Sequence, residues 1–285
     1  MGTDAFIGFD SAWTDNLKAP GAICAAGVQD GRTVFWHPPR LASFKEAQAF
    51  IEMVRSADGT TLIALDQPTL VPNSESMRPV ERAVASVVSW LGGGVQAAHT
   101  GKLGMFCKDS PVWPFLKAVD AVQDPERART ATDGTYLIEV FPALALPSLA
   151  ASFATRMGAP KYNPGNRKQY KPADWRSVTA AVAKEAKGLG CLELEAWCLG
   201  AGGISNPKKA DQDRLDAGIC LAVALRWRLR PREDSIMIGD LVTGYMVTPA
   251  SAVMRERLKA AATKMGGVSV DGILAAAQPA HMIMR

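Results

Sequence analysis

The sequence is poor in histidine and cysteine. Three histidines and five cysteines are spread over 285 residues, and no two cysteines have the C-x-x-C spacing of zinc and redox sites. Because the number of cysteines is odd and they are scattered, reduced thiols are the simplest interpretation. A Walker loop, a G-x-G-x-x-G turn, a G-x-S-x-G elbow and an H-E-x-x-H helix are also absent. These absences exclude many familiar classes of nucleotide-binding, hydrolytic and zinc-dependent enzyme.

Long hydrophobic runs are missing as well. The longest apolar run in the C-terminal half covers residues 217–225 and ends at Arg226, whereas about 18 residues are needed to span a bilayer. Residues 1–7 lack the basic and apolar regions of a signal peptide. With 48% hydrophobic residues and a mean hydropathy of +0.01, we expect a globular, cytoplasmic chain without membrane attachment. Its net charge of +4 permits a polyanionic partner without requiring one.

Hydrophobic periodicity predicts a mixed sheet. We expect strands at residues 5–9, 21–28, 33–36, 61–65 and 135–141, the second and third joined by an Asp30-Gly31 turn. Ser43 and Glu46 form a capping box that opens a helix over residues 44–54. Further helices are expected at 78–90, 110–122, 143–156, 174–187, 206–228 and 251–264, with a hairpin formed by residues 235–238 and 245–248.

This order of elements predicts an α/β fold. The first three strands follow one another closely and should be antiparallel, while the later two are reached through helices and should join in parallel by right-handed crossovers. We therefore expect a single domain over residues 1–285. It consists of a mixed five-stranded sheet flanked by helices, with helical insertions at about 92–134 and 155–205.

Acidic residues recur where predicted strands end. Asp10 and Asp66 each follow a buried strand, and Glu139 lies near the end of the fifth. In open α/β sheets, ligands bind beyond the carboxyl ends of the strands. Each acid could also cap the following turn, but three acids at equivalent places favour convergence in one site.

The long helix over residues 206–228 supplies two more acids. Asp213 and Asp216 are separated by three positions and therefore share one face, beside an apolar stripe that includes Leu215 and Ile219. Clustered carboxylates need compensating cations or raised pKa values. Oxygen ligands without histidine or cysteine favour Mg²⁺ or Mn²⁺. Two such ions about 4 Å apart can hydrolyse a phosphodiester without a separate histidine base.

Several ordered segments between about residues 5 and 250 carry a resemblance to a known family. They are Ile7-Gly-Phe-Asp10, Ile63-Ala-Leu-Asp66-Gln-Pro68, Arg78 with Glu81-Arg82, Ile138-Glu-Val-Phe-Pro142, Asp213-Arg-Leu-Asp216-Ala and residues 238–249. Together with the strand order, they resemble the ribonuclease-H-like superfamily and, within it, the predicted nuclease family catalogued as domain of unknown function 429.

The resemblance implies a metal-dependent nuclease and assigns the site residues. Asp10 would be the central metal ligand, Asp66 the fourth-strand acid and Glu139 the fifth-strand acid. Asp213 and Asp216 resemble the D-x-x-D helix acids of Holliday-junction resolvases. One departure is that resolvases place a glutamate, a longer side chain, at the position of Asp66.

Basic residues supply candidates for binding the phosphates of DNA or RNA. Residues 156–176, the basic segment, carry six cations against one acid, Asp174, and are interleaved with Tyr162, Tyr170 and Trp175. Basic residues among aromatics suit phosphates and stacked bases, although a solvated insertion would have the same composition. The candidate substrate-binding residues are Arg78, Arg82, Lys102, Lys168 and Lys171. A structural salt bridge with Glu81 or another acid is the alternative for the two arginines.

The leading hypothesis is a Mg²⁺- or Mn²⁺-dependent nuclease that uses Asp10, Asp66, Glu139, Asp213 and Asp216. A non-catalytic nucleic-acid-binding or regulatory protein of the same fold is the alternative. A nucleotide phosphotransferase related to actin and sugar kinases is a third hypothesis. That class needs glycine-rich phosphate loops, and the Ser-Ala-Trp13 sequence after Asp10 argues against it.

Overall fold

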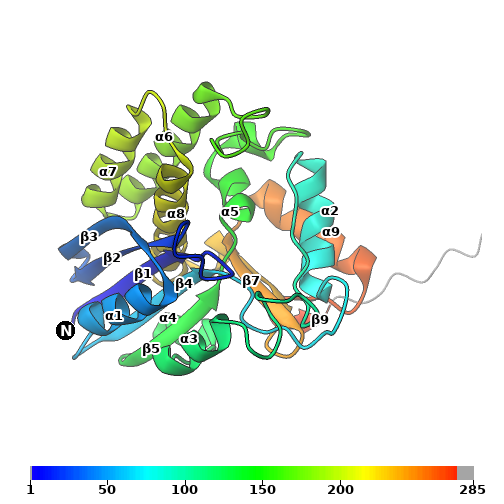
Figure 1. Cartoon of the computed structure of the whole chain (residues 1–285), viewed down its shortest axis with the longest axis horizontal. Helices are drawn as coiled ribbons and strands as arrows, with labels where there is room; N and C mark the ends of the chain where they lie inside the picture. Colours follow the sequence, from blue (N-terminus) through cyan, green and yellow to red (C-terminus); the bar gives the residue numbers. More distant parts are fainter. Residues whose placement is uncertain (1, 275–285) are drawn as a thin grey trace, which may run out of the picture.

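A five-stranded sheet lies at the centre of the protein, in a computed structural model that describes residues 2–274 (Figure 1). Its strands are β1 (Asp4–Asp10), β2 (Gly21–Gln29), β3 (Arg32–Ala42), β4 (Thr60–Asp66) and β5 (Gly134–Glu139), in the order β3-β2-β1-β4-β5. β1 and β3 are antiparallel to β2, whereas β4 is parallel to β1 and β5 is parallel to β4. The predicted α/β class and the mixed five-stranded sheet are confirmed.

Helices cover both faces of this sheet. One face packs on α1 (Phe44–Val54) and α3 (Val112–Val119), and the other on α8 (Lys209–Leu229), with α6 (Pro172–Gly188) and α7 (Leu192–Gly202) beside it (Figure 1). Successive side chains of a strand point to opposite faces. Accordingly, Ile7 and Phe9 belong to the α1–α3 core, while Phe6 and Leu62 belong to the α8 core. Even-numbered positions of β1 and β4 therefore face α8.

Helix α8 crosses β1 at Gly8. A Cβ atom at this position would lie 2.2 Å from the carbonyl oxygen of Ala217 and 2.4 Å from the backbone nitrogen of Leu221. Only a residue without a side chain allows this approach of helix to strand. Leu215 and Ile219 are fully buried, which confirms the apolar stripe predicted for this helix. The close contact sets the N-terminal half of α8 beside the end of β1.

A second sheet flanks the first. It contains β6 (Ser235–Asp240), β7 (Gly244–Pro249), β8 (Ser269–Val270) and β9 (Ile273–Leu274) in the order β7-β6-β8-β9. Helices α2 (Pro79–Trp90) and α9 (Ala252–Met265) pack on it (Figure 1). A parallel bridge between Val140 and Val247 joins it to the end of β5. The predicted terminal hairpin is confirmed, whereas β8 and β9 are too short to have been recognised from periodicity.

Several boundaries differ from the prediction. β3 continues through Pro38 and Pro39 because it is an edge strand of its sheet, where missing backbone donors are tolerated. The predicted helix 110–122 ends after Val119, where Asp120 adopts a φ of +49°. The predicted helix 143–156 divides into α5 (Pro142–Leu149) and a 3₁₀ turn, η1 (Ala151–Ala154). Helices α4 (Pro125–Thr130) and α7 were not predicted.

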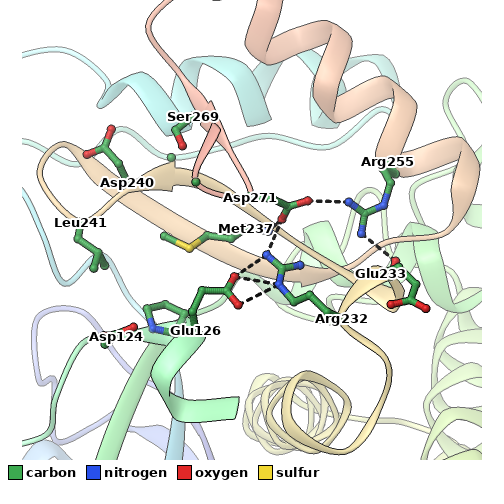
Figure 2. A pocket seen from close by; sticks show the side chains of 13 residues that line it. Asp124, Glu126, Arg232, Glu233, Met237, Asp240, Leu241, Arg255, Ser269 and Asp271 are labelled. Carbon is green, nitrogen blue, oxygen red and sulfur yellow. Dashed lines mark hydrogen bonds and ion pairs between the residues drawn. The ribbon is translucent and has the colours of Figure 1, made fainter. Parts of the chain in front are cut away.

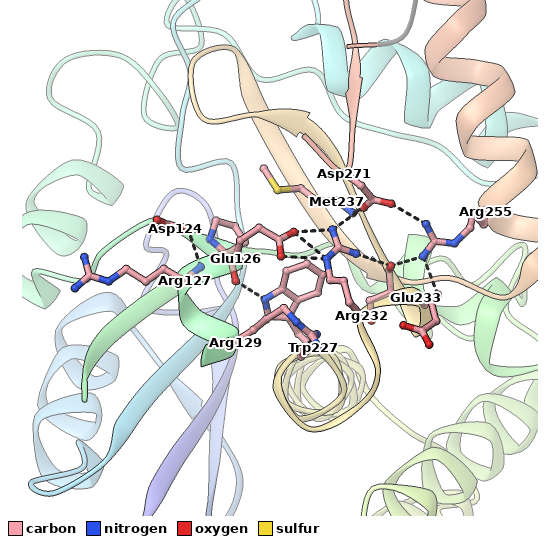
Figure 3. Close-up of polar contacts among 12 residues, drawn as sticks. Asp124, Glu126, Arg127, Arg129, Trp227, Arg232, Glu233, Met237, Arg255 and Asp271 are labelled. Atoms are coloured by element: carbon pink, nitrogen blue, oxygen red, sulfur yellow. Dashed lines mark hydrogen bonds and ion pairs between the residues drawn. The ribbon is translucent and has the colours of Figure 1, made fainter. Parts of the chain in front are cut away.

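Ion pairs around Arg232 connect the second sheet to helix α4, which packs beside the central sheet (Figure 3). Arg232, in the 3₁₀ turn η2 (Arg232–Asp234), donates to Glu126 at the start of α4 and to Asp271 in the β8–β9 turn. Arg255 of α9 donates to the other carboxylate oxygen of Asp271 at 2.7 Å. The Arg232 guanidinium also lies 4.5 Å from the ring centre of Trp227. Arg232 therefore links α4 and the β8–β9 turn to the end of α8, and Arg255 adds α9 through Asp271.

Between residues 2 and 274, no helix is both long and apolar enough to cross a membrane.

Candidate functional site

Four of the five predicted acids meet where β1 and β4 end beneath α8. Asp10 and Asp66 are register partners at the ends of two parallel strands. Both are at even-numbered positions and therefore face α8, where Asp213 and Asp216 share one side of the helix. Asp10, Asp66 and Asp216 line a cavity of about 270 Å³. These four residues are called the acid cluster below.

The fifth predicted acid, Glu139, has different surroundings. In the register of β5 it lies opposite Leu65 rather than Asp66, so its side chain leaves the opposite face of the sheet. Its oxygens accept hydrogen bonds from Arg78 Nη2 at 2.5 Å, from Arg78 Nη1 at 3.0 Å and from the Thr69 backbone nitrogen at 3.0 Å. Glu139 lies at the rim of the same cavity, but these contacts favour a structural role. Its assignment as a metal ligand stays a prediction.

Arg78 is a buried structural residue. Its side chain is inaccessible to solvent and lies between Glu139 and Glu81, whose Oε1 accepts from Arg78 Nε at 2.9 Å. Burial alone would lower the pKa of Arg78, but Glu139 and Glu81 outweigh it and raise the pKa above its usual value. Arg78 thus forms the salt bridge with Glu81 that was its alternative role, and its assignment as a substrate-binding residue stays a prediction.

The acid cluster is strained electrostatically. Burial, followed by the charges of Asp216, Asp66 and Asp213, raises the pKa of Asp10 well above its usual range. Burial and then Asp216 do the same to the pKa of Asp66. Burial raises the pKa of Asp216 to about 7, although hydrogen bonds from Tyr162 and Gln212 and the charge of Lys209 act against the shift. A bound cation would relieve this repulsion.

Three residues that the sequence analysis missed hold these acids. The Tyr162 hydroxyl donates to Asp216 Oδ1 at 2.7 Å, and the Gln212 amide donates to Asp216 Oδ2. The Lys209 ammonium forms an ion pair with Asp213, one helical turn away. Lys209, Gln212, Asp213 and Asp216 follow the i, i+3, i+4, i+7 spacing of one helix face, a signal present in the sequence. The contact of Tyr162 joins residues 54 positions apart and has no local signal.

Apolar side chains also line this cavity. Trp13, Val95, Phe141 and Met246 line it. The indole nitrogen of Trp13 donates to the backbone oxygen of Asp66 at 3.2 Å, and its ring meets Phe106 edge to face with 5.3 Å between ring centres. The cavity thus combines a cation-attracting side with a surface on which a planar group can pack.

The predicted basic residues do not line this cavity. Arg82 is exposed and donates to the Met77 carbonyl oxygen at 3.2 Å, and Lys102 is half-buried in a loop. Lys168 and Lys171 are exposed on the basic segment, which Tyr162 ties to Asp216. Roles for these residues in binding substrate stay predictions.

The aromatic residues of the basic segment differ from the expectation. Trp175 is buried and donates to the Ala201 carbonyl oxygen at 2.9 Å, and Tyr162 is buried as well. Neither ring is available for stacking on a base, because both are part of the core. Their burial favours the view that they anchor the segment.

A larger cavity, of about 770 Å³, lies on the second sheet (Figure 2). Four of its charged side chains pair with one another: Arg232 with Glu126 and Asp271, and Arg255 with Asp271. Asp240 accepts from the backbone nitrogen atoms of the following turn. Because these ion pairs and hydrogen bonds join distant segments, we interpret the cavity as a structural junction.

The acids are not a preformed ligand set. Over the described residues 2–274, no group of three or more His, Cys, Asp or Glu side chains is arranged to hold a metal ion. The contacts of Asp213 with Lys209 and of Asp216 with Tyr162 and Gln212 account for part of this arrangement. By donor chemistry the carboxylates suit a hard cation, but they require rearrangement to bind one.

Comparisons with known proteins add little. No protein-family model and no solved structure matches the chain. A stretch of 65 residues is 35% identical to the protein transport protein sec31 of Schizosaccharomyces pombe, and this match covers 23% of the chain and 5% of that protein. A likeness this short assigns neither a family nor a function.

Proposed function

We propose that this chain is a divalent-metal-dependent hydrolase of nucleic-acid phosphodiester bonds, built on a ribonuclease-H-like fold. One observation carries the proposal: the paired strand ends bring Asp10 and Asp66 together under Asp216, whose charge adds to burial in raising the pKa of both residues. Carboxyl groups with strongly raised pKa values cluster at functional sites. The sheet order is the one that the resemblance implies.

Asp10, Asp66 and Asp216 would hold the cation, joined by Asp213 after it separates from Lys209. Mg²⁺ or Mn²⁺ bound there would supply Lewis-acid catalysis and activate water at neutral pH. Within the chain, Tyr162 and Gln212 fix the orientation of the Asp216 carboxylate. The apolar wall with Trp13 limits access of bulk water and can support a nucleoside next to the reacting phosphate.

The basic segment supports a polyanionic substrate. Arg167, Lys168, Lys171 and Arg176 are exposed, and the segment is fixed beside the acid cluster by Tyr162. Surface cations at this place compensate a phosphate backbone that the acids alone would repel. The segment that would supply cations for the strand is therefore joined through Tyr162 to the acids that would hold the metal.

The test is a cleavage assay with metal-stripped protein. Labelled single strands, duplexes, RNA–DNA hybrids and four-way junctions are incubated with Mg²⁺, Mn²⁺ or EDTA. We expect cleavage of at least one substrate with metal, none with EDTA, and loss of cleavage in Asp10→Asn. Asp30→Asn, in the exposed β2–β3 turn, is the matched control and should cleave normally.

Two outcomes would contradict the proposal. Survival of every substrate, together with salt-sensitive binding of nucleic acid, would favour the non-catalytic binding protein. Equal cleavage by wild type and Asp10→Asn would show that the activity lies elsewhere or comes from a contaminant.

A further inference from the structure

We propose that Lys209 is a tethered counterion that occupies the acid cluster in the metal-free protein and that a divalent cation displaces. The inference rests on the proposed function, and it adds that Lys209 regulates the metal site by competing with the cation for the same acids. Lys209 is the first residue of α8, one turn before Asp213, and its ammonium pairs with that carboxylate. The Lys209 side chain is 52% exposed, whereas that of Asp213 is 10% exposed. The ammonium thus reaches from solvent into the cluster.

Lys209 acts on the whole cluster rather than on one partner. Its charge opposes the rise in pKa of Asp10, Asp66, Asp213 and Asp216 alike. Arg214, the neighbouring cation on α8, opposes the rise in pKa of Asp213 and forms an ion pair with Asp211 at 2.9 Å. One ammonium therefore serves four carboxyl groups, and the compensation is incomplete.

A buried acceptor without a partner indicates that the cluster is built for something more than Lys209. Gln212 lines the cavity, is 7% exposed and uses its amide nitrogen for Asp216, while its Oε1 atom is buried without a hydrogen-bond donor. Buried polar atoms are seldom left in this state. A metal ion with its water ligands would bring positive charge to the acid cluster and a hydrogen-bond donor to the Gln212 Oε1 atom.

The ammonium and a metal ion compete for the same oxygens. A divalent cation at the cluster would repel the Lys209 ammonium at short range, and the same carboxylates would be drawn to the larger charge. The half-exposed, flexible lysine stem allows the ammonium to move into solvent while the backbone stays in the helix. Displacement of Lys209 therefore weakens metal binding relative to a site without this lysine.

Lys209→Met removes the charge and keeps the length of the side chain. Lys208→Met is the matched control, because Lys208 is the adjacent exposed lysine and its contact with Asp211 uses its backbone nitrogen. Mn²⁺ is titrated into the full, EDTA-stripped chain in a calorimeter. We expect Lys209→Met to bind Mn²⁺ about tenfold more tightly than wild type, the change that about 1.4 kcal/mol produces. Lys208→Met should bind like wild type.

The possible outcomes distinguish failure of the proposed Lys209 role from failure of the proposed metal site. If wild type binds Mn²⁺ and Lys209→Met binds equally or more weakly, the counterion role is wrong while the metal site stands. If only Lys209→Met binds Mn²⁺, the counterion role is supported in its strongest form. If neither binds, both proposals are wrong. Should Lys209→Met fail to fold, Lys209→Gln replaces it, and Lys209→Arg, which keeps the charge, should retain the wild-type affinity.

Discussion

Tyr162 donates a hydrogen bond to Asp216 at 2.7 Å and so links the basic segment to the acid cluster. The bond is buried, and the hydroxyl has been withdrawn from water to make it. Burial, followed by the charge of Asp216, accordingly raises the pKa of Tyr162 well above its usual value. The segment that could contact phosphates is therefore fixed by the same carboxylate that would hold a metal.

Tyr162→Phe should loosen this link. Removing the donor leaves Asp216 with one hydrogen bond fewer, at a cost of roughly 1–3 kcal/mol in the free energy of unfolding. Hydrogen exchange of residues 161–171 should become faster, while α8 away from residue 216 keeps its protection. Tyr170→Phe, in the same segment and half-buried, is the control. Unchanged exchange in Tyr162→Phe would show that the hydrogen bond does not hold the segment.

Local sequence patterns predicted the central sheet because each signal lies within a few residues. The Asp30-Gly31 turn, the Ser43–Glu46 capping box and the apolar runs all have local causes, and the capping box has both of its expected hydrogen bonds. Asp10 and Asp66 were placed together because each follows a strand and both strands were expected to point the same way. These features needed no knowledge of long-range contacts.

The features that could not be predicted from the sequence depend on contacts between residues far apart in the chain. The register of β5 on β4, which turns Glu139 away from α8, depends on packing between strands about 70 residues apart. The Tyr162–Asp216 bond depends on the path of a long connection. Lys209 could have been found, since it precedes Asp213 by one helical turn, but its ordinary role as a surface lysine gave no reason to single it out.

Arg78→Met should destabilise the protein severely. The substitution leaves Glu81 and Glu139 buried without their cation, and breaking a buried ion pair in this way costs about 3–5 kcal/mol. Urea unfolding should show a lower midpoint. Arg82→Met, one turn away and exposed, should stay within about 0.5 kcal/mol of wild type. A similar small effect for both variants would contradict the structural role of Arg78.

Asp271→Asn should destabilise the protein in a pH-dependent way. Burial alone would raise the pKa of Asp271, but the Met237 backbone nitrogen, Arg232 and Arg255 outweigh it and lower the pKa below its usual 3.8. A lowered pKa stabilises the fold above the unfolded value, and this contribution is lost as pH falls through the folded pKa. Asparagine also tolerates the φ of +51° at this position.

The free energy of unfolding, measured for wild type and Asp271→Asn between pH 7 and pH 2.5, checks this expectation. The difference should be roughly 1–3 kcal/mol at pH 7 and shrink below about pH 4. A difference that stays constant over the whole range would show that the charge of Asp271 does not stabilise the Arg232 junction.

Asp10→Asn should stabilise the metal-free protein while it removes function. The substitution replaces a carboxylate that repels Asp66 and Asp216, so the melting temperature in EDTA should rise, by the equivalent of roughly 0.5–2 kcal/mol. Excess Mn²⁺ should stabilise wild type and leave the variant unchanged. A lower melting temperature for Asp10→Asn in EDTA would mean that the Asp10 carboxylate supports the fold.

The most direct measurement is anomalous scattering from crystals of the protein soaked in Mn²⁺. We expect at least one manganese peak within ligand distance of Asp10 and Asp66, with Asp216 turned toward it and the Lys209 ammonium moved away from Asp213. Crystals of Asp10→Asn treated in the same way should lack the peak. An acid cluster without manganese in well-diffracting wild-type crystals, with Lys209 still on Asp213, would contradict a metal-dependent active site at this place.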